Sequence, residues 1–229
     1  MSKKLFTALG FCVLVTSLSA TPISCTGLTT LQAYINLGTA GCTVGDKLFF
    51  GFFYVATGGA PAATSIGVSA INPAPNIQGL AFGPFLVTGP SDIGIAYNVM
   101  SMSGPTIGGT SLAIAGVGGS GSWAAAVTEG VCFGMTITSA MSCADASSPV
   151  SLLSAFVFPP DSSAAASASF TPVGLIGVFK DIVLIPGSGP LAVSFVDNQF
   201  SQIPEPGAMA LVGAGLLLLT GLWKYRRRV

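Results

Sequence analysis

The feature that most constrains the fold of this 229-residue sequence is an uncharged apolar run near its C-terminus, at residues 207–223. At about 1.5 Å per residue, a helix over this run and its flanks spans roughly 30 Å, the thickness of one hydrocarbon core. The run has no polar face, so a transmembrane helix is favoured over a helix buried in a protein core. The basic tail, residues 224–229, predicts a cytoplasmic C-terminus and places everything upstream outside. Its stop-transfer cations are Lys224, Arg226, Arg227 and Arg228.

The triplet Pro204, Glu205 and Pro206 stands directly before the apolar run. A plain stop-transfer helix explains the run and the cations, but it does not explain this triplet. Together, and in this order, the three parts resemble the PEP-CTERM sorting signal of Gram-negative bacteria, here over residues 201–229. The resemblance implies recognition of the triplet by an exosortase, a membrane-embedded transpeptidase-like protease. It further implies that the tail is removed during export to the cell surface or the extracellular matrix.

The N-terminus also predicts export. Lys3 and Lys4 precede an apolar segment at residues 5–18, and small residues follow up to Ala20. This pattern is typical of a Sec signal peptide, here residues 1–20. An uncleaved N-terminal anchor is the alternative, and a lipoprotein modified at Cys25 is disfavoured by the poor lipobox before it.

Residues 21–200 are expected to form a secreted β-rich ectodomain. Gly, Pro or Ser interrupts each apolar stretch between residues 26 and 203, which disfavours a polytopic membrane protein. Short strand-like segments between turn residues are typical of an antiparallel β-sandwich. Alternation is clear over residues 92–99, where Ile93, Ile95, Tyr97 and Val99 share one face and Asp92 and Gly94 the other, and it is less clean over residues 173–181. One helix is predicted near residues 27–37, capped by Thr26 and ended by Gly38. The strands are expected at 47–55, 66–71, 78–86, 92–102, 111–116, 123–127, 131–138, 150–158, 165–170, 175–185 and 191–196. The Ser/Ala-rich stretch 162–169 is compatible with either a loop or an outer strand.

Two segments of this ectodomain resemble a domain that recurs among PEP-CTERM proteins. The stretch from Cys25 through the Gly-Cys-Thr-Val-Gly-Asp-Lys turn at residues 41–47 and into the aromatic strand is similar to its beginning. Residues 180–182 and 200–203 are similar to its end.

The cysteines fit an exported protein. Cys12 lies in the signal peptide, and Cys25, Cys42, Cys132 and Cys143 remain. Four cysteines allow three pairings. We expect the local one, Cys25 with Cys42 and Cys132 with Cys143, in which each disulfide stabilises the fold by about 3 kcal/mol.

The charge of the exported part excludes one class of partner. Two lysines stand against seven acidic residues between Thr21 and Ile203, a net charge of −5. Such a domain offers no basic patch, so nucleic acid is not an expected partner. The expected partners are the exosortase, the bacterial membrane and an exopolysaccharide.

Catalytic chemistry has few candidates. The chain contains no His, so the Ser-His-Asp and Cys-His arrangements are impossible. Glu129 is the one glutamate between residues 21 and 203, and a glycosidase would have to pair it with an aspartate. A calcium site from Asp197 and Asn198, or from Asp145, lacks a multi-oxygen loop pattern. We therefore expect no cofactor, no metal and no enzymatic activity. The expected protein is non-enzymatic and surface- or matrix-associated, adhesive or exopolysaccharide-associated; a surface hydrolase acting on polysaccharide is the alternative.

Overall fold

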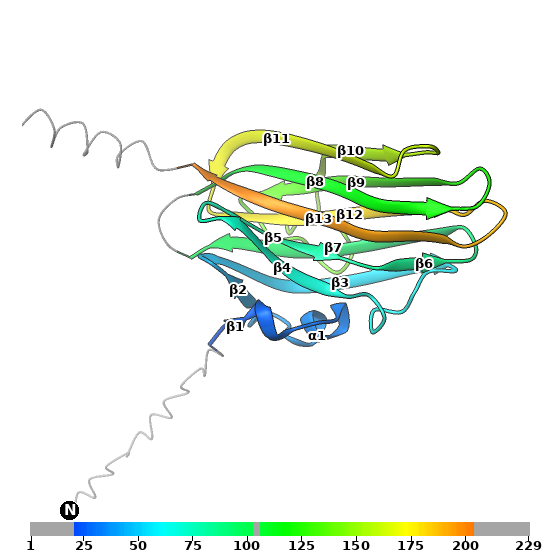
Figure 1. Ribbon diagram of the computed structural model, residues 1–229. Helices are drawn as coiled ribbons and strands as arrows, with labels where there is room; N and C mark the ends of the chain where they lie inside the picture. Colours follow the sequence, from blue (N-terminus) through cyan, green and yellow to red (C-terminus); the bar gives the residue numbers. More distant parts are fainter. Residues whose placement is uncertain (1–20, 103–105, 204–229) are drawn as a thin grey trace, which may run out of the picture.

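The computed structural model describes residues 21–102 and 106–203, which form a sandwich of two β-sheets (Figure 1). The first sheet has seven strands in the order β1-β2-β3-β7-β12-β9-β10, and the second has the order β11-β8-β13-β5-β4, with β6 paired to β13. The mainly β fold expected from the sequence is confirmed. The strands are β1 Ile23–Ser24, β2 Cys42–Val44, β3 Lys47–Gly58, β4 Val68–Ala74, β5 Ile77–Phe82, β6 Phe85–Val87, β7 Ser91–Ser101, β8 Thr106–Gly119, β9 Ala124–Phe133, β10 Val150–Val157, β11 Ser163–Val173, β12 Leu175–Ile185 and β13 Leu191–Ile203.

The core fills the space between the two sheets. Strand β7 alternates as predicted, with Ile93, Ile95 and Tyr97 fully buried between the sheets. The Tyr97 ring packs against aromatic rings from β3, β5 and β13, including Phe52 at a centroid distance of 5.3 Å. The residues that alternate with them on β7, Asp92 among them, therefore point to the outer face of the seven-stranded sheet.

The predicted helix is shorter than expected and begins later. A 3-10 turn covers Cys25–Gly27, and the helix α1 covers Leu31–Asn36. Thr30, not Thr26, caps α1, because its hydroxyl accepts a hydrogen bond from the Ala33 N–H. The intervening backbone instead forms hydrogen bonds with residues 66–68, which hold it extended.

Two strand predictions are wrong, and one alternative left open is decided. The two strands predicted at 123–127 and 131–138 are one strand, β9, because Glu129 points into the core and does not mark a turn. The strand predicted at 78–86 is divided into β5 and β6 at Gly83-Pro84. The Ser/Ala-rich stretch is an outer strand, β11, paired with β8.

Both ends of the described chain lie at the same end of the sandwich, on the left in Figure 1. Strand β1 pairs with β2, whose hairpin partner β3 begins at Lys47 opposite Ser101. Strand β13 ends at Ile203, opposite Thr106. Because Thr106 is only a few residues after Ser101, Ile203 lies at the same end as Lys47. We call this the proximal end, and the end at Ser91 and Ile185 the distal end. No helix in the described ranges is long and apolar enough to cross a membrane. The predicted span 207–223, its flanking motifs and the signal peptide lie outside the described residues.

Candidate functional site on the outer face of the seven-stranded sheet

An ion pair lies inside the sandwich. Lys180 on β12 and Glu129 on β9 are direct cross-strand neighbours, and both side chains are 0% exposed. The Lys180 Nζ atom lies 2.5 Å from Glu129 Oε2. Burial lowers the pKa of Lys180, and the Glu129 carboxylate opposes that shift. The pair is therefore desolvated, and each ion depends on its partner.

The six-stranded sheet completes the hydrogen bonding of this pair. The Thr110 hydroxyl donates to Glu129 Oε1 at 3.0 Å, and it accepts from Asn198 Nδ2 at 2.9 Å. The Tyr97 hydroxyl donates to Asn198 Oδ1 at 2.5 Å. Burial raises the pKa of Tyr97 well above its ordinary value, so the phenol stays protonated. We call Tyr97, Thr110, Glu129, Lys180 and Asn198 the interior network.

The interior network removes Glu129 from the candidates for catalysis. A glycosidase acid must reach a sugar, whereas this carboxylate is buried, paired and hydrogen-bonded. Its role in this fold is structural. The sequence showed that Glu129 is the one glutamate between residues 21 and 203. It did not indicate Lys180 as its partner, because that pairing depends on the register of β9 against β12.

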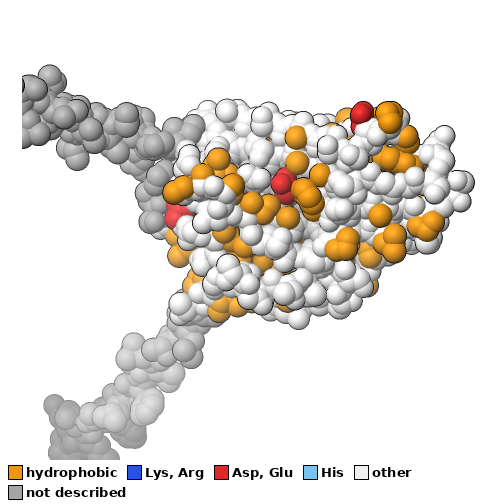
Figure 2. Space-filling view, in the orientation of Figure 1, with side chains coloured by type: hydrophobic (Ala, Val, Ile, Leu, Met, Phe, Trp, Pro, Cys, Tyr) orange, Lys and Arg blue, Asp and Glu red, His pale blue; other side chains and the backbone are white. Residues whose placement is uncertain are grey.

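The second lysine is also buried. Lys47 Nζ donates to Gln78 Oε1 at 2.8 Å and lies 3.4 Å from Asp46 Oδ1. The Gln202 side chain donates to Asp46, which ties the end of β13 to the start of β3. Since the described ranges hold no Arg and no His, they expose no cationic side chain. The face of the six-stranded sheet in Figure 2 accordingly shows acidic side chains and no basic ones.

The outer face of the seven-stranded sheet carries two aligned rows of side chains at its distal half. Each row crosses β10, β9, β12, β7 and β3, one residue per strand, through direct cross-strand pairs. One row is Phe156, Ala126, Val183, Asp92 and Thr57; the other is Ser154, Thr128, Asp181, Gly94 and Val55.

A depression of about 240 Å³ lies where the rows meet β7, between Val55, Phe179 and the two aspartates. Gly94 forms its floor. A Cβ atom there would come within 2.7 Å of Val55 and 3.2 Å of Phe179, so any other residue would close the space. A second depression of about 260 Å³ shares Thr57 and Asp92 with the first and extends to Ile185.

Asp92 and Asp181 form a carboxyl pair in the first depression. They stand on neighbouring strands in a diagonal relation, within side-chain reach. The pKa of Asp181 is raised by partial burial and by the hydrogen bond and the negative charge of Asp92. The two carboxyl groups therefore interact, and their oxygens can accept hydrogen bonds from a ligand in the depression.

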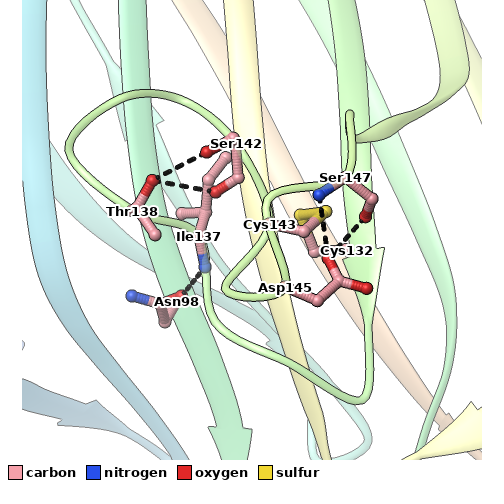
Figure 3. Close-up of a disulfide and its surroundings, with 8 residues drawn as sticks. All are labelled: Asn98, Cys132, Ile137, Thr138, Ser142, Cys143, Asp145 and Ser147. Atoms are coloured by element: carbon pink, nitrogen blue, oxygen red, sulfur yellow. Dashed lines mark hydrogen bonds between the residues drawn. A yellow bond between two sulfur atoms is a disulfide. The ribbon is translucent and has the colours of Figure 1, made fainter.

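A disulfide-bonded loop covers the proximal half of the same face. Cys132 on β9 bonds to Cys143 in the loop 134–149 (Figure 3). The Ile137 N–H donates to Asn98 Oδ1 at 2.7 Å, and the loop backbone lies close over Gly177, where a Cβ atom would meet it at 2.4 Å. Ile137, Met135 and Met141 pack with Phe53, Ala96 and Phe179. The loop therefore covers the proximal half of this face and borders the distal half, where the two depressions lie. We call it the loop wall.

The outer face of the other sheet has a different lining. Its depression of about 270 Å³ is bordered by short side chains, among them Ser111, Ser167 and Ser201, and includes no aromatic ring. Asp197 also points to this face, and partial burial raises its pKa. This depression offers hydroxyl groups, but its lining holds no ring of the kind that Phe179 provides in the first depression.

The predicted site residues divide into two groups. Both local disulfides, Cys25–Cys42 and Cys132–Cys143, are present. Pro204, Glu205 and Pro206, and the four stop-transfer cations, lie outside the described residues. Asp197 and Asn198 point to opposite faces of β13, so they do not converge on one cation. Within the described ranges, no three His, Cys, Asp or Glu side chains gather as a metal site would require.

Sequence reasoning missed the Asp92–Asp181 pair. The alternation of β7 predicted that Asp92 and Gly94 share a face, but that of residues 173–181 was less clean. The register of β7 against β12 brings the two carboxyl groups together.

Comparisons with known proteins show no family for this chain. No protein-family model matches it, and no curated protein matches its sequence. Among solved structures it is similar to TmCBM61 in complex with β-1,4-galactotriose, at 12% identity and a TM-score of 0.33, over 66% of this chain and 88% of that one. It is similar to a family 11 carbohydrate-binding module from Clostridium thermocellum, at 10% identity and a TM-score of 0.30, over 67% and 90%. It is also similar to the enzymatically active domain of bacteriophage CBA120 tailspike protein 4, at 8% identity and a TM-score of 0.29, over 74% and 21%. Likenesses this remote carry no information about the ligand or activity of this chain.

Proposed function

We propose that this chain is an exported, non-enzymatic surface or matrix protein whose ectodomain associates with polysaccharide. The observation that carries the proposal is the contrast between its carboxylates. Glu129 is buried in an ion pair, while Asp92 and Asp181 are open to solvent beside apolar side chains. A few polar groups beside apolar walls are typical of sites that bind ligands.

Glycoside hydrolysis, the alternative function, would have to use the open pair of Asp92 and Asp181. A retaining glycosidase holds its carboxyl groups about 5 to 5.5 Å apart, and an inverting one about 6.5 to 9.5 Å. Asp92 and Asp181 stand diagonally on neighbouring strands, and no other carboxyl group of the described residues lines the depression. Incubating the full-length protein with neutral and acidic polysaccharides tests binding and hydrolysis together. We expect the protein to bind a polysaccharide and to release no reducing ends from it. If reducing ends are released, and Asp92→Ala abolishes that release, the protein is a hydrolase instead.

The proposed route to the surface uses the sorting signal at residues 201–229. Two disulfides in the ectodomain support passage through an oxidising compartment. In the proposal, Pro204 and Pro206 keep the backbone extended outside the bilayer, and Glu205 is the single charge that the exosortase reads. The protein is held in the inner membrane by its C-terminal helix before processing and reaches the cell surface or matrix afterwards.

The sorting proposal predicts the outcome of one substitution. In a host with an intact exosortase, Glu205→Ala should leave a membrane-retained form that is heavier than the processed protein by the mass of the tail, about 2 to 3 kDa for a helix long enough to span the bilayer. Intact-mass measurement of the membrane and extracellular fractions checks this. If the wild type also keeps its tail, the segment is a plain anchor and the sorting proposal is wrong.

A further inference from the structure

We propose that a neutral polysaccharide chain binds the distal half of the outer face of the seven-stranded sheet, lying along the two rows across the strands. The Asp92–Asp181 pair supplies the hydrogen bonds, and Phe156 and Phe179 supply the apolar contacts. This inference rests on the proposed function and adds to it a location and a class of ligand.

The first argument is charge. The described surface exposes no cation, and its charged side chains are acidic. A uronic-acid or sulfated polymer would meet like charge at the depression and find no Arg or Lys to offset it. Hydroxyl groups of a neutral sugar can donate hydrogen bonds to the carboxylate oxygens of Asp92 and Asp181. The chemistry of the depression therefore selects against polyanions.

The second argument is the arrangement of apolar groups. Phe156 is 54% exposed, Val55 49% and Ile185 47%, and all three border the rows or the adjoining depressions. Phe179 stands between the loop wall and the depression. Sugar rings have apolar C–H faces that gain from contact with such groups when water is removed. A row that crosses five strands suits an extended chain better than a compact ligand.

The third argument is position. The rows lie toward the distal end, away from Ile203, which leads directly into the proposed sorting segment. The loop 134–149 covers the proximal half of the face, so the open part is the part that faces away from the attachment point. A polymer in the surrounding matrix can reach it while the chain is still anchored.

The experiment is affinity electrophoresis of the full-length protein in a polyoxyethylene detergent, which carries no sugar head group. The gels contain dextran, galactan, mannan or polygalacturonate. The test variants are Asp92→Ala/Asp181→Ala and Phe156→Ala. The matched controls are Asp161→Ala, an exposed acid between β10 and β11, and Phe195→Ala, an exposed ring on the other sheet. Thermal unfolding midpoints establish that each variant is folded.

We expect at least one neutral polysaccharide to retard the wild type and polygalacturonate not to do so. Each test variant should lose about tenfold in affinity, as expected for one or two charge-assisted hydrogen bonds or one stacked ring, and the controls should not. Binding of a neutral polymer that both folded test variants retain overturns the site but leaves the proposed function standing. Binding of polygalacturonate alone overturns the ligand class. A wild type that binds none of the polymers overturns the proposed function together with this inference.

Discussion

Lys180 and Asp181 are adjacent in the sequence and lie on opposite faces of one strand. Lys180 points inward, where Glu129 and the rest of the interior network satisfy it. Asp181 points outward, where its closest charged neighbour is a second carboxyl group, and its pKa is raised. One face of β12 thus holds matched charges, and the other holds charges that remain available to a ligand.

Two adjacent residues of β12 thus have different roles, Lys180 in stability and Asp181 in the proposed binding. A buried ion pair with full hydrogen bonding tolerates no loss of either partner, but its net contribution to stability is small compared with a well-packed apolar pair. A partly exposed pair of like charges reduces stability slightly and keeps polar atoms free for recognition. The two clusters should therefore respond to substitution in opposite ways.

The largest expected effect is on the interior network. Lys180→Met should lower the free energy of unfolding by about 3 to 5 kcal/mol, because it leaves the Glu129 carboxylate buried without its cation. Chemical denaturation of the full-length protein measures this change.

The double variant Glu129→Leu/Lys180→Met is the matched control, since it removes both charges at once. It should recover most of the loss, because an apolar pair of similar volume needs no partner. A single variant within about 1 kcal/mol of the wild type would show that the ion pair is not desolvated as described.

The next effect concerns the two halves of the outer face. Replacing Cys132 and Cys143 by Ala should lower stability by about 3 kcal/mol through loop entropy. It should also speed hydrogen exchange at the Ile137 and Cys143 amides, which lie in the loop wall, but not at Asp92 in the open half. Removing the Cys25–Cys42 disulfide should have a similar effect on stability without changing exchange in the loop. If both variants speed hydrogen exchange in the loop equally, the position of the loop does not depend on the Cys132–Cys143 disulfide.

The sequence predicted the sandwich, the β7 alternation and both disulfides because these depend on local signals: period-two patterning, turn residues and short cysteine spacing. It did not predict the single strand β9, because Glu129 in a polar stretch resembles a turn until Lys180 is seen opposite it. Nor did it predict the Asp92–Asp181 pair, which depends on register between strands some 90 residues apart in the sequence. Long-range pairing, not residue type, decided the position of the candidate site.

The smallest expected effect is the pH dependence of stability that Asp181 produces. The pKa of Asp181 in the folded protein is raised above its ordinary value, which is about 4. Between these two pKa values the folded state holds a proton that the unfolded state has lost. Stability therefore falls as the pH rises from about 4 through the raised pKa. Asp181→Asn cannot lose a proton, so it should be more stable than the wild type at neutral pH. The difference should shrink as the pH approaches 4.

Solvent screens this partly exposed pair, so the difference should be a fraction of a kcal/mol, and thermal unfolding from pH 4 to pH 8 is the suitable measurement. The groups that face Asp181 are Asp92 on β7 and Thr128 on β9, while Lys180 on its own strand points to the core. Thr128 does not titrate, which leaves Asp92 as the source of the shift beyond burial. Asp161→Asn removes the same charge from an exposed connection. If it produces the same pH-dependent difference, the effect belongs to the net charge of the domain, and the contrast between the two faces of β12 loses its electrostatic basis.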